Sequence, residues 1–521
     1  MITVFSEDES FHYDIHSLIQ AFYPGEEIKV RGDIPAEEAD YALETEVSGD
    51  KLLLSFSKPS DDDGAFDESY VNQVPSSNEK DDDLRDKSYV NHPHTPEITL
   101  PADSERPIVK SEIKRLIYRA LSEWLEISLP WGTLTGIRPT KIAMDLLKQG
   151  ESGEKVFSRM EDWYLASPKK AALSLEIASR EKAFIEKVAH PGGYSLYIGI
   201  PFCPTRCLYC SFASNPIVQD KKTGRPKYVE EYLESLFKEL EFCADMTKGR
   251  PLDSLYIGGG TPTALSEEDF ERLLVKVREL YPVVPFEFTI EAGRPDSITE
   301  KKLLLMKEYG ATRISVNPQT MNQATLDRIG RKHTVEQVKE AFLMARNLGF
   351  SNINMDLILG LPGETRADVE HTLKEIGFLS PDSLTVHSLA VKRASKLREL
   401  LDEEREKGGS TRESLENSES LVELAEQEAR DMGLLPYYLY RQKNMAGNLE
   451  NVGYARENCF GAYNVLMMEE VQDIIACGAG TISKRVYEDG RIERCDNVKE
   501  LAQYLGRIDE MLERKRVLFG E

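Results

Sequence analysis

Three of the seven cysteines lie in one stretch, Tyr197-Ile198-Gly199-Ile200-Pro201-Phe202-Cys203-Pro204-Thr205-Arg206-Cys207-Leu208-Tyr209-Cys210. The stretch opens with an apolar run typical of a buried β-strand and closes with the spacing Cys-x3-Cys-x2-Cys. A loop this short can bring three thiolates to one soft metal centre. The sequence therefore predicts that Cys203, Cys207 and Cys210 are metal ligands that directly follow a strand.

The number of thiolates indicates the kind of centre. A structural zinc takes four ligands, and the nearest histidine, His190, lies upstream across the whole strand. A four-iron cluster on three thiolates keeps one iron open. Radical S-adenosylmethionine (SAM) chemistry uses that iron, because SAM chelates it and is cleaved to a 5′-deoxyadenosyl radical. The pattern favours a [4Fe–4S] cluster and SAM over zinc. The other cysteines are expected to be packing residues: Cys243, Cys459, Cys477 and Cys495.

Strand-like runs alternate with helical patterns downstream of residue 190. The apolar runs are 196–200, 254–257, 286–290, 313–316, 353–359 and 383–389. Helical periodicity covers 228–243, 267–281, 300–309, 335–348 and 366–378, and a last helix is expected near 396–405. Such alternation predicts right-handed βαβ units and a parallel sheet. We predict an α/β fold, a partial (β/α)6 barrel, with its catalytic groups at the carboxyl ends of the strands.

The predicted barrel occupies residues 166–405. Residues 1–165 alternate short strand-like and helical runs and are predicted to form an N-terminal α/β extension. Within this extension, the region near 59–107 is polar and acidic and is predicted to be a disordered insertion. Residues 406–521 are predicted to form a small C-terminal α/β domain.

Glycines and polar residues follow successive predicted strands. Gly258-Gly259-Gly260-Thr261 follows the second strand, and glycines let a ligand approach the backbone closely. Glu291 ends the third strand and could hold the ribose or a cationic group of SAM, or be a solvated strand-end residue. Arg313 could belong to the site or to a structural ion pair, and His333 could be a helix-start residue. Together these positions predict a ligand site at one end of the barrel.

These motifs in combination resemble the oxygen-independent coproporphyrinogen III oxidase family, a radical SAM family. The resemblance covers residues 190–400 and rests on Tyr-x-x-x-Pro-Phe-Cys-x3-Cys-x2-Cys, Gly-Gly-Gly-Thr-Pro-Thr, Arg-x-Ser-x-x-x-Gln, Gly-Arg-x-His-Thr and Asp-Leu-Ile-x-Gly-Leu-Pro. The Trp131–Lys141 motif and the long N-terminal extension look like the HemZ branch of the family.

The resemblance implies a set of SAM contacts. Tyr197 corresponds to the tyrosine that lines the SAM site, and Tyr209 corresponds to the aromatic residue that stacks on adenine. The other implied contacts are Gly259, Gly260, Thr261, Glu291, Gln319, Arg331, Asp356, Ala390 and Ile482.

The resemblance also implies a reaction. In the family, the adenosyl radical removes hydrogen from the β-carbon of a propionate, and loss of one electron and CO₂ leaves a vinyl group. Two such events convert coproporphyrinogen III to protoporphyrinogen IX. Phe212, however, stands where the oxidase proper has a fourth cysteine. Two alternatives therefore stay open: a haem-binding trafficking protein with the same cluster, and a radical SAM enzyme with another substrate.

Several basic residues could recognise the carboxylates of a tetrapyrrole, since guanidinium groups suit carboxylates. Surface charge is the alternative for this group, which consists of Lys392, Arg393, Arg441 and Lys443. A flavodoxin or a ferredoxin is the expected electron donor, and we expect a monomer.

Composition excludes other classes of partner. The formal net charge is −25 at pH 7 and no basic patch is visible, which argues against nucleic-acid binding. The chain has no apolar run long enough to span a membrane. No signal peptide opens the sequence, and the clustered, odd-numbered cysteines are typical of reduced thiols, so we expect a cytoplasmic protein.

Overall fold

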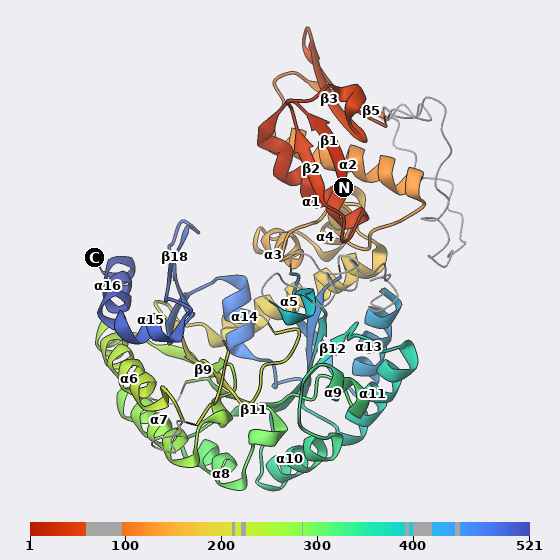
Figure 1. Ribbon diagram of the computed structural model, residues 1–521. Coiled ribbons are helices and arrows are strands. Elements are labelled where there is room, and N and C mark those ends of the chain that lie inside the picture. Colours follow the sequence, from red (N-terminus) through yellow and green to blue (C-terminus); the bar gives the residue numbers. More distant parts are fainter. Residues whose placement is uncertain are drawn as a thin grey trace. The chain divides into compact units, whose positions relative to one another are not determined.

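The computed structural model describes residues 1–58, 96–210, 214–219, 226–283, 285–390, 395–399, 419–442 and 449–520 (Figure 1). Contacts divide the chain into two compact units. The N-terminal unit consists of Met1–Leu175 and Arg441–Leu449, and the barrel unit consists of Glu176–Tyr440 and Glu450–Glu521. The boundaries predicted from the sequence, near residues 165 and 405, stay predictions.

The N-terminal unit contains a five-stranded sheet in the order β2-β1-β3-β4-β5. Its strands are β1 (Ile2–Ser6), β2 (Ile28–Arg31), β3 (Tyr41–Ser48), β4 (Lys51–Ser57) and β5 (Glu97–Pro101). The helices α1 (His12–Phe22) and α2 (Arg106–Leu125) share one apolar core with this sheet. Within the core, Trp124 of α2 stacks on Tyr41 and Phe56, with ring centroids 6.1 and 5.6 Å away. Buried aromatic packing of this kind stabilises a small sheet.

The disordered insertion predicted near residues 59–107 extends too far toward the C-terminus. Residues 59–95 lie outside the described residues. Glu97–Pro101, however, form β5, which pairs antiparallel with β4 and buries Ile98 in the core. The helix α2 begins at Arg106, with a proline in its first turn, where the missing N–H costs nothing. Ile98 and Leu100 are separated by a polar residue, an alternation that indicates a β-strand. The acidic residues around this short segment hid the pattern.

The rest of the N-terminal unit is helical. It contains α3 (Thr140–Lys148), α4 (Gly153–Ser158), a π-helical turn (Arg159–Trp163) and the start of α5 (Pro168–Val188). The Trp131–Lys141 segment leads into α3, and Trp131 is completely buried.

The barrel unit is built on an eleven-stranded open sheet in the order β14-β15-β13-β12-β11-β10-β9-β6-β16-β17-β18. The six predicted strands are present as β6 (Tyr194–Ile200), β9 (Leu252–Gly259), β10 (Glu287–Gly293), β11 (Arg313–Val316), β12 (Ile353–Leu359) and β13 (Ser383–Ser388). Neighbours among these six pair in parallel. Among the described strands, β14 and β18 are the two ends of the sheet and do not pair with each other. The prediction of a partial barrel is therefore confirmed.

Strands from the C-terminal part of the chain extend this sheet on both sides. They are β14 (Leu435–Tyr440), β15 (Asn451–Ala455), β16 (Asp473–Cys477), β17 (Ile482–Val486) and β18 (Ile492–Asp496). The strand β16 runs parallel to β6, and β15 runs antiparallel to β13. The described part of the predicted C-terminal domain thus shares a sheet with the barrel strands.

Helices cover the outer side of the sheet in an arc (Figure 1). They are α6 (Val229–Met246), α7 (Glu267–Leu280), α8 (Glu300–Glu308), α10 (Val335–Asn347), α11 (Arg366–Leu379) and α13 (Glu419–Asp431). Side-chain caps define where several of them begin: Ser266 caps α7, Thr299 caps α8, and Thr334 forms a capping box with Gln337 at α10. Further helices are α9 (Gln323–Arg328), α14 (Ala462–Glu469), α15 (Leu501–Gly506) and α16 (Ile508–Phe519). Among the described residues, no helix is both long and apolar enough to cross a membrane.

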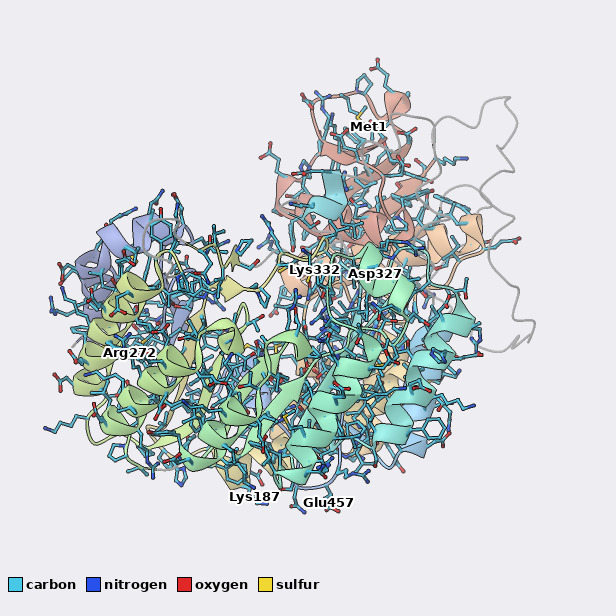
Figure 2. The ribbon with its side chains drawn as sticks, turned by 60° about the horizontal axis from the view of Figure 1, so that its bottom comes forward. Met1, Lys187, Arg272, Asp327, Lys332 and Glu457 are labelled. Carbon is cyan, nitrogen blue, oxygen red and sulfur yellow. The ribbon has the colours of Figure 1, made fainter. Side chains whose placement is uncertain are left out.

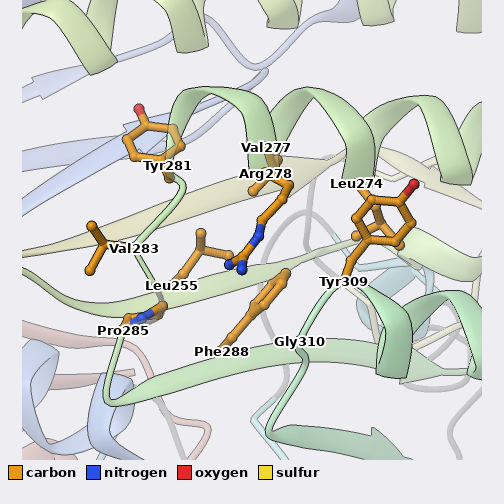
Figure 3. Close-up of a pocket in the computed structure, with 10 residues that line it drawn as sticks. All are labelled: Leu255, Leu274, Val277, Arg278, Tyr281, Val283, Pro285, Phe288, Tyr309 and Gly310. Atoms are coloured by element: carbon orange, nitrogen blue, oxygen red, sulfur yellow. The ribbon is translucent and has the colours of Figure 1, made fainter.

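A small cavity lies between α7 and the strands β9 and β10 (Figure 3). Its volume is about 10 Å³, and apolar side chains such as Leu255, Leu274 and Phe288 line it. It has room for about one water molecule. None of the predicted site residues lines it, so this cavity is a packing gap under the outer helices.

Candidate cofactor site

The cysteine loop, residues 203–210, leaves the barrel sheet at the carboxyl end of β6. Cys203 is buried, whereas Cys207 and Cys210 are partly exposed. All seven cysteines lie in the described residues, and none forms a disulfide. The pKa of Cys203 is raised to about 11, chiefly by burial and with a contribution from Cys210 and Cys207, while the Thr261 hydrogen bond opposes the increase. The three thiols therefore share one electrostatic environment, in which a bound cation would favour their thiolate forms.

The donor set fits an iron–sulfur cluster. Iron–sulfur clusters are held by cysteine thiolates, and three thiolates on a four-iron cluster bind three different irons. Among the described residues, no group of three or more His, Cys, Asp or Glu side chains is gathered closely enough to hold a single metal ion.

The glycine-rich loop after β9 packs directly on the cysteine loop. The N–H groups of Gly260 and Thr261 donate to the carbonyl oxygens of Ile200 and Phe202 at 2.7 and 2.8 Å. The hydroxyl of Thr261 donates to the Sγ of Cys203 at 3.5 Å. A Cβ atom at position 260 would lie 2.6 Å from the carbonyl oxygen of Phe202 and 2.9 Å from the Sγ of Cys203. The glycine-rich loop therefore needs Gly260 in order to pack against Cys203, a predicted cluster ligand.

We expect the substitution Gly260→Ala to weaken cluster binding. The added methyl group would displace the backbone at Phe202 or the thiol of Cys203, because neither contact leaves room for it. Disturbing the support of a metal ligand typically costs about 10–100-fold in affinity. Iron and sulfide content after anaerobic reconstitution measures the loss. The matched control is Gly506→Ala, because a Cβ there meets no atom within 4 Å. Wild-type cluster content in the Gly260→Ala protein would contradict the prediction.

Glu291, at the carboxyl end of β10, lies in a cluster of tyrosines. The hydroxyl of Tyr256 donates to its Oε1 at 2.5 Å. The rings of Tyr197, Tyr256 and Tyr463 stack on one another, with centroid separations of 4.6 to 5.8 Å. A Cβ at Gly258 would lie 2.9 Å from the Glu291 carboxyl carbon, so this glycine makes room for the carboxyl group. Glu291 is thus a positioned group and not a solvated strand-end residue.

The pKa of Glu291 lies near neutrality. Burial raises it to about 7, the charge of Asp356 adds to the increase, and the Tyr256 hydrogen bond opposes it. The pKa of Tyr256 and that of Tyr197 are both raised, chiefly by burial, so these neighbours stay neutral at pH 7. Because the pKa of this acid is raised in the folded protein, its contribution to stability is largest below about pH 4.5. That contribution is lost as the pH rises through about 7.

We expect SAM affinity to increase with pH through about 7, because the carboxylate of Glu291 accepts hydrogen bonds and attracts cations whereas the acid does so poorly. Between pH 6 and pH 8 the ionised fraction of a group with pKa 7 changes about tenfold, which limits the gain to about that factor. Equilibrium dialysis with labelled SAM measures the affinity. The Glu291→Gln protein should bind SAM weakly and without this pH dependence. A parallel pH profile in both proteins would contradict the assignment.

Gln319 and Asp356 are held together by backbone hydrogen bonds. The N–H of Gln319 donates to the carbonyl oxygen of Asp356, and the N–H of Ile358 donates to that of Gln319, each at 2.9 Å. Gln319 has a φ of 69°, in the left-handed region that residues other than glycine rarely adopt. Strain of this kind is typical of ligand sites. The carboxylate of Asp356 accepts from the side-chain amide of Asn354 at 2.6 Å.

Arg331 contacts the cysteine loop at Tyr209. A guanidinium nitrogen of Arg331 lies 3.4 Å from the hydroxyl oxygen of Tyr209, and Arg331 is buried. The ring of Tyr209 packs against an apolar cluster that includes Ile329, Leu361 and Leu389. The structure thus brings Tyr209 and Arg331 together, although they are far apart in the sequence.

Two predicted contacts lie at the margin of this group. Ala390 follows β13, and Ile482 begins β17 with 45% of its surface exposed. The residue before it, Thr481, lies against the end of β6, since a Cβ at Gly199 would be 2.6 Å from its methyl carbon. No described contact joins Ala390 or Ile482 to the cysteine loop, so their assignment stays a prediction.

The basic group proposed to bind carboxylates is only partly described. Lys392, Arg393 and Lys443 lie outside the described residues, as does Phe212. Arg441 is 4% exposed, and its guanidinium donates to the carbonyl oxygen of Leu134 at 2.6 Å. Its backbone N–H donates to the carbonyl oxygen of Ile137 at 2.7 Å. The expectation of an exposed surface charge was wrong for Arg441, which contacts the Trp131–Lys141 segment within the N-terminal unit, and its role in carboxylate binding stays a prediction.

Sequence reasoning missed several residues around the site. Tyr256 and Tyr463 surround Glu291, and Arg294 donates to the cysteine loop at Thr205. Arg313, by contrast, is buried and donates to Ser383 Oγ at 3.2 Å, which agrees with a structural role. The available signal for Arg294 was a polar residue four positions after the predicted strand 286–290.

The open barrel, with three cysteines on a loop at its strand ends, defines a radical SAM protein. A family model described as the radical SAM superfamily matches residues 197–376. The cofactors are a [4Fe–4S] cluster and SAM.

Similar proteins show to which family of radical SAM proteins the chain belongs. The chain is 39% identical over 413 residues to the oxygen-independent coproporphyrinogen-III oxidase-like protein HemZ of Bacillus subtilis (strain 168), and the match covers 78% of this chain and 80% of that protein. The chain therefore belongs to the HemZ-like branch of the oxygen-independent coproporphyrinogen III oxidase family. It is also 39% identical to the heme chaperone HemW of B. subtilis over 38% of this chain and 50% of HemW. It is 33% identical to the oxygen-independent coproporphyrinogen III oxidase of Escherichia coli (strain K12) over 40% of this chain and 45% of the oxidase.

Proposed function

We propose that the protein converts the propionate groups of coproporphyrinogen III to vinyl groups without oxygen. Each propionate loses a hydrogen atom, an electron and CO₂ in this reaction. The observation that carries the proposal is the packing of the β9 loop on the cysteine loop, beside the positioned carboxyl of Glu291. The oxidase-like relative matches the chain over most of both lengths, which supports a tetrapyrrole as the substrate.

In this proposal Cys203, Cys207 and Cys210 are the cluster ligands. When bound, the cluster and SAM supply the 5′-deoxyadenosyl radical. The proposed SAM contacts are Tyr197, Tyr209, Gly259, Gly260, Thr261, Glu291, Gln319, Arg331, Asp356, Ala390 and Ile482. The tyrosines pack beside the partly buried carboxyl group of Glu291, and the charge state of this group decides what it can bind.

We propose a flavodoxin or a ferredoxin as the electron donor, because reductive cleavage of SAM consumes one electron per event. We also propose a cytoplasmic location, since none of the seven described cysteines is in a disulfide.

A haem-binding chaperone is the second candidate. The observation that favours it is the match to HemW at 39% identity, which equals the identity to HemZ although it covers less of the chain. Phe212, where the oxidase proper has a fourth cysteine, points in the same direction.

One experiment separates the two candidates. The full-length chain is reconstituted anaerobically and supplied with SAM, a chemical reductant and coproporphyrinogen III. Protoporphyrinogen and 5′-deoxyadenosine are then quantified, and haem binding is titrated in parallel. Protoporphyrinogen formation that requires SAM would support the oxidase. Stoichiometric haem binding without porphyrinogen turnover would support the chaperone, and SAM cleavage with neither result would leave another substrate.

A further inference from the structure

Arg294, directly after β10, connects two loops that meet at the proposed cluster. It is 3% exposed. Its Nε and Nη2 atoms donate to the two carboxylate oxygens of Asp296 at 2.9 and 2.6 Å. Its remaining nitrogen, Nη1, donates to the hydroxyl of Thr205 at 2.6 Å and to the carbonyl oxygen of Thr205 at 3.3 Å. Thr205 stands midway between Cys203 and Cys207, so Nη1 holds this part of the cysteine loop while Nε and Nη2 fix the guanidinium on Asp296.

The position of Arg294 is itself well supported. The hydroxyl of Ser297 donates to the Arg294 carbonyl oxygen at 2.8 Å. The ammonium group of Lys302, which is buried on α8, donates to the carbonyl oxygens of Ser297 and Thr263 at 3.1 and 2.6 Å. Thr263 belongs to the same β9 loop that packs on Cys203. The β9 and β10 loops therefore form one rigid support under the cysteine loop.

The cysteine loop also contacts residues 329–331. The guanidinium of Arg331 lies against the hydroxyl of Tyr209, and two further contacts involve only main-chain atoms and a hydroxyl. The hydroxyl of Thr205 donates to the carbonyl oxygen of Gly330 at 3.3 Å, and the N–H of Leu208 donates to that of Ile329 at 3.0 Å. These two contacts carry no charge. Arg294 is thus the group that brings a full positive charge against Thr205.

That charge lies close to two of the proposed ligands. Burial opposes the charged form of Arg294, but Asp296 and then Cys207 and Cys203 raise its pKa, so the guanidinium and these thiols interact. Asp296 compensates the charge from the other side: burial would raise the pKa of its carboxyl, yet Arg294 holds it lowered. In a buried setting such charges are screened weakly and act strongly on a nearby redox centre. Net charge and hydrogen bonds around a cluster set its reduction potential.

We propose that Arg294 is a positioning residue for the cluster. It orients the cysteine loop through Thr205, and its positive charge raises the reduction potential of the cluster. The negative charge of Asp296 acts in the opposite direction and lowers this potential. The inference rests on the proposed assignment of Cys203, Cys207 and Cys210 as cluster ligands. It makes a prediction about sign: neutralising Arg294 and neutralising Asp296 change the potential in opposite directions.

The test is a redox titration of the reconstituted full-length protein, followed by electron paramagnetic resonance of the reduced cluster. In Arg294→Gln the ratio of reduced to oxidised cluster at a fixed potential should fall about tenfold, or about 59 mV for a one-electron couple. In Asp296→Asn the same ratio should rise. Arg294→Lys keeps the positive charge but loses the two parallel hydrogen bonds to Asp296. The reduction potential should therefore stay close to that of the wild type, whereas the cluster content should fall.

Arg272→Gln is the matched control. Arg272 lies on α7 among the outer helices. It lies away from Lys332, the neighbour of the residue Arg331 that contacts the cysteine loop (Figure 2). Like Arg294 it makes a bidentate pair, here with Glu230 at 2.8 and 2.9 Å, but its side chain is 37% exposed. The potential of Arg272→Gln should equal that of the wild type.

Three outcomes would overturn the proposal: shifts of the same sign in Arg294→Gln and Asp296→Asn, wild-type potentials in both, or an equal shift in the control. If Arg294→Gln fails to bind iron, Arg294→Lys and Asp296→Asn decide the matter, because both keep a cation at position 294. The proposed function fails separately. A wild-type protein without a cluster would remove both proposals, whereas shifted potentials without any porphyrinogen product would remove only the substrate.

Discussion

The Cys207→Ala protein is expected to bind no [4Fe–4S] cluster and to cleave no SAM. Its visible iron–sulfur absorbance should disappear, and 5′-deoxyadenosine production should fall by at least about 10³-fold, because residues that act as one unit are lost together. The physical reason is that three thiolates bind three irons and leave the fourth iron open. With only two thiolates, a second iron loses its bond to the protein. Iron content, absorbance and 5′-deoxyadenosine are measured after identical anaerobic reconstitution.

Cys207 suits this test better than Cys203. Cys207 is partly exposed, so its replacement leaves no cavity in the core, whereas Cys203 is buried and accepts a hydrogen bond from Thr261. Cys495→Ala is the control, since this partly exposed thiol lies on β18. Circular dichroism should show the same fold for both variants. A Cys207→Ala protein that keeps full iron–sulfur absorbance would refute the ligand assignment.

The second large effect concerns stability and involves the buried ion pair between Glu239 of α6 and Lys515 of α16. The Lys515 ammonium donates to Glu239 Oε1 at 2.6 Å, and both side chains are at most 1% exposed. Glu239 accepts three further hydrogen bonds, from the hydroxyl of Tyr504, the N–H of Gly478 and the side-chain amide of Asn497, at 2.6, 2.7 and 2.7 Å. This carboxylate therefore joins α6, α15, α16 and the β16–β17 turn.

We expect Lys515→Met to lower the free energy of unfolding of the barrel unit by about 3–5 kcal/mol, because it leaves a buried carboxylate without its counter-charge. Urea unfolding of the full-length protein measures the loss. Burial alone would lower the pKa of Lys515, but Glu239 outweighs it and the pKa is raised. The stability that the raised pKa of Lys515 contributes is therefore fully present below about pH 10.5, and it is lost at higher pH.

The chain supplies a matched control between the same two helices. Lys238 of α6 pairs with Asp509 of α16 at 2.5 Å, but the two side chains are 50% and 82% exposed. An exposed pair contributes about 0–1 kcal/mol, so Lys238→Met should have little effect. The double variant Glu239→Gln/Lys515→Met should recover part of the loss, because no buried charge is left unpaired. Equal losses for Lys515→Met and Lys238→Met would contradict the prediction.

Much of the barrel could be predicted from local patterns. The predicted strands at 313–316 and 353–359 coincide with β11 and β12, and the predicted helix at 335–348 differs from α10 by one residue. Alternation of apolar runs and helical periodicity depends on neighbouring residues alone, so it can be read without a structure. The spacing of the three cysteines is local in the same sense.

Other features could not be predicted because their local signals were weak or misleading. The strand β3 has a weak local signal, since its second half, from Glu44 to Ser48, is exposed and polar except for Val47. The acidic surroundings hid β5. Arg441 looked like a surface cation, and only its burial against the Leu134 carbonyl shows otherwise. In each case the environment of the residue, and not its type, decides its role.

By itself the sequence determined the order of the barrel strands and helices and the residues at the strand ends, and it predicted the thiol ligand set. The tertiary structure alone decided which distant segments meet. It pairs β16 with β6, joins Arg294 to Thr205 across 89 residues, and joins Lys515 to Glu239 across 276 residues. Such contacts are set by how the elements pack around a shared core and not by any short pattern. A short sequence pattern therefore predicts the chemistry of the cysteine loop, whereas contacts between distant segments of the fold hold this loop in position.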